Sequence, residues 1–288
     1  MQTVLVTGAN GQLGNELKKI APQYPQFRFL FVSREELAID DFDAVSKYFA
    51  THEIDHCINC AAYTAVDKAE SEPQKAFLIN ADAVGNLATV CRENNTRFIH
   101  VSTDYVFDGT VNHPYKETDI TNPIGVYGSS KLRGEELALQ HDPSVIIIRT
   151  SWLYSSYGNN FVKAMLRLMK ERDSVNVVND QTGSPTYAAD LAAGIIEIIA
   201  NEKSLEKGGI YHYANSGAAT WYEFALAIRQ ISGSSCSVNP IPTAQYPTAA
   251  KRPAYSVLNT SKIRETFNIS IPDWKDSLTH CLAIIEKS

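Results

Sequence analysis

Two short motifs, about a hundred residues apart, contain residue types that could do chemistry together. The first is Val-Thr-Gly-Ala-Asn-Gly-Gln-Leu-Gly at 6–14, and the second begins at Tyr127 and ends at Lys131. A separation of four residues places both side chains on one helix face. A free tyrosine titrates at about 10. A neighbouring ammonium would lower that pKa, so Tyr127 could protonate a carbonyl oxygen. Thr103 would donate a second hydrogen bond, which predicts carbonyl–alcohol redox chemistry with Thr103, Tyr127 and Lys131 as catalytic residues.

The glycine motif predicts a site for a nicotinamide cofactor. The apolar run 3–6 is typical of a buried strand, and 15–20 has helical periodicity. Gly8 would form the tight turn, Gly11 would let a pyrophosphate approach, and Gly14 would let helix and strand pack closely. The free N–H groups of the helix N-terminus would bind the phosphates. The predicted cofactor-binding residues of this loop are Gly8, Asn10, Gly11, Gln12, Leu13 and Gly14. Tyr127 and Lys131 are also predicted to contact the cofactor, Lys131 through the nicotinamide ribose.

The residues after the second predicted strand indicate which cofactor is used. An acidic residue there would bind the adenosine ribose and favour NAD. This chain instead has Ser33 and Arg34 after Phe29–Val32. An arginine suits a 2′-phosphate because its planar guanidinium makes charge-assisted hydrogen bonds. We therefore predict NADPH, with NADH as a second cofactor.

These residues must be positioned by an alternating pattern of strands and helices. Strands are expected at 3–7, 27–33, 55–60, 97–102 and 144–150, with helical patterns between them. The alternation predicts an α/β fold, a Rossmann-type doubly wound parallel sheet with a smaller, interleaved C-terminal lobe. Thr103 would then lie at the carboxyl edge of the sheet, where sites form in such folds. The expected domains are 1–152 for the cofactor, with returning pieces near 186–215, and 153–288 mainly for the substrate.

Composition narrows the class of protein. The chain of 288 residues is 44% hydrophobic and 20% charged, as expected for a globular protein with a sizeable core. A net charge of −6 gives no indication of nucleic-acid binding. The longest apolar runs are far shorter than the ~20 residues of a membrane span. No signal peptide precedes the first strand, so we expect a cytoplasmic protein. Five cysteines indicate no disulfide framework, and the histidines show no metal-ligand spacing, so no metal site is predicted.

Several further blocks resemble the dTDP-4-dehydrorhamnose reductase family of the extended short-chain dehydrogenase/reductase superfamily. The blocks at 102–109 and 181–186 are specific to this family, whereas the glycine and Tyr/Lys motifs are shared with many relatives. The similarity covers most of the chain. The matching blocks are 61–70, 102–109, 115–119, 123–128, 149–154, 180–186, 252–253 and 256–259.

The resemblance implies a substrate and further site residues. The expected reaction is reduction of the 4-keto group of a nucleotide-activated 6-deoxy sugar. The substrate would be dTDP-4-dehydro-β-L-rhamnose, and the product dTDP-L-rhamnose would serve cell-surface polysaccharide. Arg252 is the best phosphate ligand on chemical grounds. The loop Ala61, Ala62 and Tyr63 is expected to contact the cofactor. The expected substrate-binding residues are Thr103, Asp104, Trp152, Asn160, Gln181, Thr186 and Arg252.

Two features depart from the family pattern. Relatives often have an Asp beside the adenine where this chain has Ala38, with Asp40 or Asp41 as substitutes. Some relatives bind magnesium through glutamates at a dimer interface. Glu16 matches the first of these, but Asp190 near the second is a different residue type, and the third has no match. No metal is therefore predicted, and the chain is expected to be a monomer or a homodimer.

Two other functions stay open at this point. One is another nucleotide-sugar enzyme, namely an epimerase, a dehydratase or a different 4-keto reductase. A dehydratase usually carries an Asp-Glu pair after the catalytic threonine, whereas this chain has Asp104-Tyr105. The other is a non-catalytic NADP-binding regulatory subunit, like the β subunit of methionine adenosyltransferase. The intact set of Thr103, Tyr127 and Lys131 argues against it.

Overall fold

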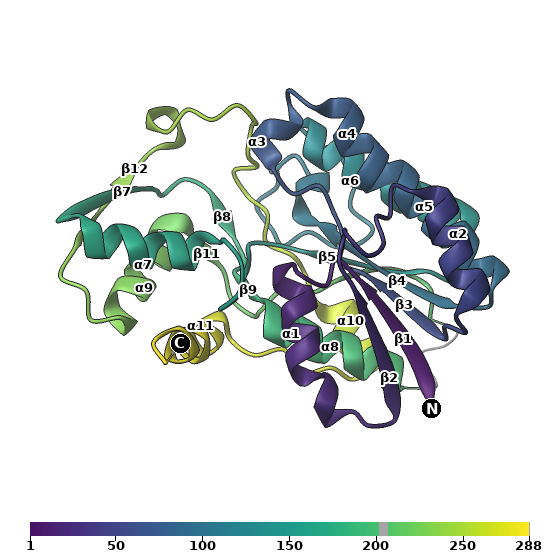
Figure 1. The fold of residues 1–288 in the computed structure, drawn as a ribbon. Helices are drawn as coiled ribbons and strands as arrows, with labels where there is room; N and C mark the ends of the chain where they lie inside the picture. The colour runs from purple at the N-terminus through teal and green to yellow at the C-terminus, as the bar shows by residue number, and fades with distance from the viewer. Residues whose placement is uncertain (202–206, 288) are drawn as a thin grey trace.

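The centre of the protein is a six-stranded parallel sheet in the order β10-β5-β4-β3-β1-β2 (Figure 1). The structure is a computed structural model that describes residues 1–201 and 207–287. The five expected strands are all present, which confirms the parallel α/β class. The strands are β1 (Gln2–Thr7), β2 (Phe27–Val32), β3 (His56–Asn59), β4 (Arg97–Thr103), β5 (Ile146–Thr150) and β10 (Gly209–His212).

Strand β10 was not expected from the sequence. It has only four residues, begins at the second of two consecutive glycines and lies at the edge of the sheet beside β5. An edge strand pairs on one side only, so it needs no long apolar run to be stable there. The sequence pattern is correspondingly weak.

Helices cover both faces of the sheet, and alternate residues of each strand point to opposite sides. Leu5, Cys57 and Phe98 belong to one buried apolar cluster, while Val4 and Ile58 belong to the other. The first face is covered by α2 (Phe42–Thr51), α5 (Ala83–Glu93) and α6 (Val126–His141). The second is covered by α1 (Gln12–Ile20), α8 (Ala188–Ala200) and α10 (Ser261–Phe267). Burial on both faces explains why these strands are continuously apolar.

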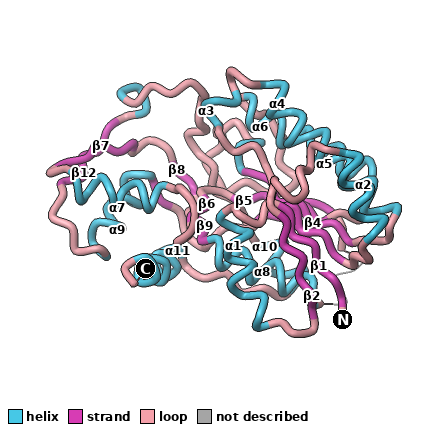
Figure 2. The backbone as a smooth tube through the Cα atoms, in the orientation of Figure 1, coloured by secondary structure: helices cyan, strands magenta, loops and turns pink. Residues whose placement is uncertain are grey.

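A second lobe is built around a third buried cluster that includes Phe224 and Trp274. Its two main strands, β7 (Ser174–Val178) and β12 (Ser237–Ile241), pair in parallel. Its helices are α7 (Phe161–Glu171), α9 (Trp221–Ile231) and α11 (Trp274–Ile285). Because α8, β10 and α10 pack on the large sheet, the chain passes between the two lobes more than once (Figure 2). The domain boundary near residue 152 stays a prediction.

Short elements connect the lobes and shape the edge of the sheet. They are the helices α3 (Val66–Ala69) and α4 (Pro73–Phe77), a π-helical turn (Leu78–Asp82), the pair β6 (Leu153–Tyr154) with β9 (Thr186–Tyr187), and the pair β8 (Thr182–Gly183) with β11 (Ala219–Thr220). Among the described residues, 3₁₀ turns lie at Ala21–Gln23, Asp104–Val106 and Thr243–Gln245. Within the described ranges, no helix has the length and apolar character that crossing a membrane requires.

Candidate active site

The predicted catalytic residues, and the predicted cofactor residues other than Ser33, line one cavity of about 830 Å³ at the carboxyl ends of the strands. This is where ligands bind in open parallel sheets. The cavity extends from the glycine loop to Trp152. Its lining includes the predicted residues Gly8, Asn10, Gly11, Gln12, Leu13, Gly14, Arg34, Ala61, Ala62, Tyr63, Thr103, Asp104, Tyr127, Lys131 and Trp152.

The glycine loop is shaped to admit a diphosphate. Gly8 has a φ of +67°, and a Cβ there would lie 2.6 Å from the backbone nitrogen of Ala61. A Cβ on Gly14 would lie 2.6 Å from the carbonyl oxygen of Gly8, so helix α1 could not pack as closely. Gly11 caps α1 without a side-chain hydrogen bond, and the first turn holds no acidic residue. The first-turn N–H groups can therefore bind an anion.

At the far end of this cavity, Arg34 lies opposite Asp40. The Arg34 Nη2 atom is 3.1 Å from the Asp40 Oδ2 atom, and the arginine side chain is 60% exposed. An exposed ion pair of this kind contributes little stability, so a phosphate dianion could replace Asp40 as the partner. Ser33 is buried, its N–H donates to Glu36, and it does not line the cavity. The phosphate-reading role of Arg34 and the cofactor contact of Ser33 stay predictions.

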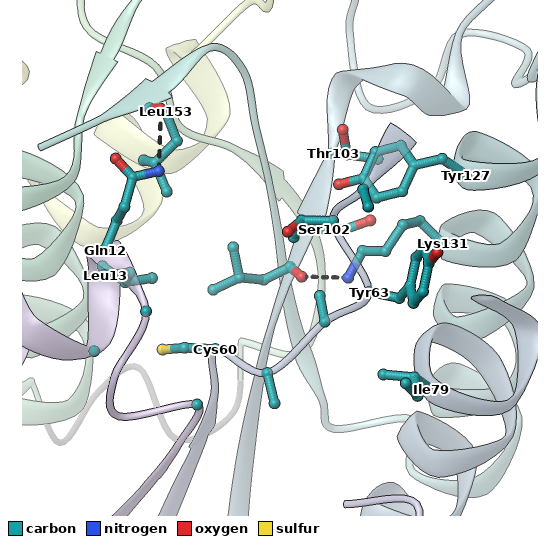
Figure 3. Close-up of a pocket in the computed structure, with 18 of the residues that line it drawn as sticks. Gln12, Leu13, Cys60, Tyr63, Ile79, Ser102, Thr103, Tyr127, Lys131 and Leu153 are labelled. Atoms are coloured by element: carbon teal, nitrogen blue, oxygen red, sulfur yellow. Dashed lines mark hydrogen bonds between the residues drawn. The ribbon is translucent and has the colours of Figure 1, made fainter. Parts of the chain in front are cut away.

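The structure brings Thr103, Tyr127 and Lys131 to one wall of the cavity (Figure 3). Thr103 ends β4, while Tyr127 and Lys131 occupy successive turns of α6. Burial raises the pKa of Tyr127 to about 12, partly offset by a hydrogen bond with Thr103 and increased by the carboxyl of Asp104. Tyr127 is thus a weak acid in this state.

The amino end of Lys131 contacts strand β4 below the tyrosine. Its Nζ donates to the carbonyl oxygen of Val101 at 2.7 Å and lies 3.1 Å from the Nε2 atom of His100. Burial lowers the pKa of Lys131 to about 8. The predicted lowering of the Tyr127 pKa by Lys131 therefore requires the lysine to exchange these partners. Neither contact was expected from the sequence, and no motif indicates His100.

Asp104 is a buried carboxyl next to Thr103 on the cavity wall. Thr103 donates to its Oδ1 atom at 3.1 Å. Burial raises the pKa of Asp104 to about 6, against the lowering effect of hydrogen bonds with Ser256 and Thr103. The Thr103 hydroxyl is therefore occupied by Asp104 in this structure.

A second cavity of about 650 Å³ lies in the smaller lobe, and two of the predicted substrate residues line it. Gln181 donates to the Thr243 hydroxyl at 3.0 Å. Arg252 donates to both carboxylate oxygens of Asp67, at 3.2 and 2.8 Å, and is only 24% exposed. Both side chains therefore border the cavity from fixed positions.

A stacked tryptophan pair lies where the two cavities approach each other. Trp152 lines the first cavity and Trp221 the second, and their ring centroids are 3.5 Å apart at an interplanar angle of 6°. Trp152 has a φ of +46°, a strained conformation for a bulky residue, and its ring lies directly over Gly183. Sequence reasoning missed Trp221, because a single aromatic residue at a helix start gives no local signal.

Two predicted substrate residues line neither cavity. Asn160 caps α7 and donates to the Oε1 atom of Gln12 at 2.9 Å. Thr186 is fully buried in β9, and its N–H donates to the carbonyl oxygen of Trp152 at 3.2 Å. Each thus contacts a residue that does line the first cavity. Their direct contact with substrate stays a prediction.

The two acidic residues that were compared with a magnesium site have protein partners. Glu16 is buried and accepts from Ser155 at 2.6 Å, while Asp190 accepts from Asn215 and Ser277. Over residues 1–201 and 207–287, no three His, Cys, Asp or Glu side chains gather in a way that could hold a metal ion.

The parallel sheet, the glycine loop before α1 and the Tyr/Lys pair on α6 define a Rossmann-type oxidoreductase of the short-chain dehydrogenase/reductase class. The family described as "RmlD substrate binding domain" matches residues 1–287. The chain belongs to this family, which comprises the dTDP-4-dehydrorhamnose reductases named below.

Relatives of this chain match it along its whole length. A dTDP-4-dehydrorhamnose reductase from Aggregatibacter actinomycetemcomitans is 44% identical over 99% of this chain and 100% of its own length. A crystal structure of such a reductase from Clostridium acetobutylicum has a TM-score of 0.94 at 38% identity, covering 99% of this chain and 100% of that one. The Bacillus anthracis reductase, in complex with NADP, gives 0.94 at 37% identity with the same coverage.

Proposed function

We propose that this protein reduces the 4-keto group of dTDP-4-dehydro-β-L-rhamnose with NADPH and releases dTDP-L-rhamnose. One observation carries the proposal: Thr103, Tyr127 and Lys131 face the glycine loop across a single cavity. The full-length match to proteins named as dTDP-4-dehydrorhamnose reductases supports the choice of sugar. The Bacillus anthracis complex with NADP supports the choice of cofactor.

Each residue of the cavity wall has a separate role in the reduction. The nicotinamide, when bound, supplies a hydride to C4 of the sugar. Tyr127 donates its proton to the O4 oxygen, so the ketone becomes an alcohol and the tyrosine a phenolate that solvent reprotonates. Thr103 leaves Asp104 and donates a hydrogen bond to the same oxygen. Lys131 leaves Val101 for the ribose hydroxyls, which brings its charge next to the phenol and lowers the pKa of Tyr127.

We assign the nucleotide to the second cavity and the sugar to the space beside Trp152. Arg252 has donors suited to a diphosphate and stands at the rim of the second cavity. Gln181 and Trp221 border the same space and are suited to a base. Asn160 and Thr186 are also assigned to substrate binding, next to Gln12 and Trp152, which they contact. We further propose a cytoplasmic enzyme, monomeric or homodimeric, with residues 1–152 chiefly binding cofactor and 153–288 chiefly binding substrate.

Turnover with an enzymatically prepared dTDP-4-keto sugar tests this function. We expect stoichiometric loss of NADPH absorbance and a product identified as dTDP-L-rhamnose by NMR. An epimerase would consume no NADPH, and a regulatory subunit would bind it without turnover. A reduced product with a different configuration at C4 would assign the protein to another 4-keto reductase activity.

A further inference from the structure

A buried hydrogen-bond chain runs beneath the cavity floor and ends at Lys131. Thr7, Asn59 and His100 lie opposite one another on the adjacent strands β1, β3 and β4. The Thr7 hydroxyl donates to the Asn59 Oδ1 atom at 2.6 Å, and Asn59 Nδ2 lies 3.1 Å from His100 Nδ1. His100 Nε2 lies 3.1 Å from Lys131 Nζ. All four side chains are buried, so bulk water does not compete for these hydrogen bonds.

The orientation of the Asn59 amide is fixed by the backbone. The N–H of Ala61 donates to the Asn59 Oδ1 atom at 3.1 Å. A backbone N–H can only donate, so the amide atom facing it must be the oxygen. Asn59 therefore presents its NH₂ group to His100. Since that group has no acceptor, the Nδ1 atom of His100 must accept.

This fixes the tautomer of His100. A neutral imidazole carries one donor and one acceptor nitrogen, so an accepting Nδ1 leaves the proton on Nε2. That N–H points at the Nζ of Lys131. Burial holds the pKa of His100 well below its usual value, which keeps the ring neutral.

A charged Lys131 does not fit this arrangement. An ammonium has three donors and no acceptor, so it would face the imidazole N–H with another N–H. A neutral amine fits, because its lone pair accepts from His100 while it donates to Val101. The same groups in the opposite tautomer would favour the ammonium.

The other titratable groups near Lys131 do not reverse this preference. Glu135 on the same helix raises the proton affinity of Lys131, but Arg149 of β5 neutralises that carboxylate through contacts of 2.6 to 3.1 Å. Burial raises the pKa of the Cys60 thiol after β3, so it stays uncharged. The raised pKa of Tyr127 keeps the phenol neutral as well.

We propose that His100 is a positioning residue, with its tautomer set by Asn59, that favours the uncharged amine of Lys131 over the ammonium in the free enzyme. This inference rests on the proposed catalytic role of Lys131. When the lysine leaves His100 for the cofactor ribose, it gains a proton from solvent and becomes the cation that the tyrosine needs. Cofactor binding and charging of Lys131 are thereby coupled.

Nitrogen NMR of ¹⁵N-histidine-labelled protein tests the tautomer directly. We expect couplings diagnostic of a proton on Nε2 of His100 in the free enzyme, with the signals assigned from their loss in His100→Gln. Asn59→Asp places a carboxylate oxygen opposite Nδ1 and should move the proton to Nδ1. Thr7→Val is the matched control, because Ala61 still orients Asn59, and it should leave the tautomer unchanged. A proton on Nδ1 in the unmodified protein overturns the proposal without any variant.

The pH profile for NADPH gives the second readout. The dependence of kcat/KM on pH reports groups of the free enzyme. In Asn59→Asp, the apparent pKa that the profile assigns to Lys131 should rise by about one pH unit or more. The reversed hydrogen bond and the new carboxylate both favour the ammonium. Thr7→Val should leave that apparent pKa unchanged. An unchanged apparent pKa in Asn59→Asp contradicts the proposal. If the dTDP sugar is not turned over, the proposed function fails, while the NMR result still decides the role of His100.

Discussion

At the residue scale, Tyr127 and Lys131 have the predicted spacing but not yet the predicted interaction. Lys131 is bound to Val101 and His100, and burial raises the pKa of Tyr127 to about 12. The free enzyme therefore holds a protonated phenol and a lysine with a lowered pKa of about 8. In the proposed mechanism, the phenol of Tyr127 therefore keeps its proton until Lys131 moves to the cofactor ribose.

Tyr127→Phe removes the proton donor while keeping the ring. We expect turnover to fall by roughly 10²–10⁴, the contribution of general acid catalysis. NADPH binding, measured by fluorescence titration, should stay within a few-fold of the unmodified protein because the cofactor loop is untouched. A variant with more than half of the original kcat would remove Tyr127 from the mechanism.

Arg34→Ala should affect the KM for NADPH and the KM for NADH differently. Loss of a charge-assisted hydrogen bond costs about 1.5–3 kcal/mol, so the KM for NADPH should rise roughly ten- to hundred-fold. The KM for NADH should change little, because NADH has no 2′-phosphate. Steady-state kinetics with both cofactors provides the comparison, and equal changes would show that Arg34 does not read the phosphate.

Asp104→Asn tests the raised pKa of the buried Asp104 carboxyl, through the pH dependence of the free energy of unfolding. The folded-state pKa of Asp104 is raised to about 6 from a model-compound value of 3.8. Its stabilising contribution is thus complete below about pH 4 and is lost as pH rises through about 6. Relative to the parent, the free energy of unfolding of the variant should increase by about 3 kcal/mol between those limits. Urea unfolding at several pH values measures it, and a pH-independent difference would contradict the assignment.

At the element scale, helix α6 delivers Tyr127 and Lys131 by packing closely on the π-helical turn Leu78–Asp82. Gly134 permits this approach, since a Cβ there would lie 2.0 Å from the carbonyl oxygen of Asn80. The positions of Tyr127 and Lys131 therefore depend on a residue two turns beyond the tyrosine.

Gly134→Ala should displace α6 and both side chains that it carries. Overpacking of this kind costs about 1–3 kcal/mol, so the melting temperature and kcat should fall together. Glu136→Ala is the control on the same helix. It breaks only the exposed pair with Arg133, worth less than about 1 kcal/mol, and should leave kcat unchanged. Normal activity in Gly134→Ala would show that α6 tolerates the shift.

At the scale of the whole molecule, two cavities from different lobes meet at the Trp152–Trp221 stack. Trp152 follows the large sheet, whereas Trp221 begins α9 of the smaller lobe. A nucleotide sugar that occupies both cavities must contact this pair. In the proposed binding mode, the stack couples the position of the sugar to that of the nucleotide.

Trp221→Ala should weaken sugar-nucleotide binding without affecting the cofactor. Loss of the stacked pair costs about 0.5–1.5 kcal/mol, so the substrate KM should rise roughly two- to ten-fold or more. Trp221→Phe should restore most of the loss, and the dissociation constant of NADPH should stay constant in both variants. A parallel loss of NADPH affinity would mean that the stack supports the fold rather than the substrate.

The sequence alone determined the features that depend on neighbouring residues. The positive φ of Gly8, the shared helix face of Tyr127 and Lys131, and the five buried strands all follow from local turn chemistry and periodicity. The end of β4 at Thr103 then placed that residue at the correct edge of the sheet. These local patterns were sufficient for the fold class and for predicting that the glycine loop, Thr103, Tyr127 and Lys131 share one site.

Only the tertiary structure decided the contacts between residues far apart in the chain. His100 reaches Lys131 because β4 lies beneath α6, and Trp221 reaches Trp152 because the smaller lobe folds back on the sheet. The same folding placed Asn160 and Thr186 behind the cavity wall rather than in it. Strand order and lobe packing are set by the summed burial of many side chains. No single local pattern therefore encodes which distant residues meet.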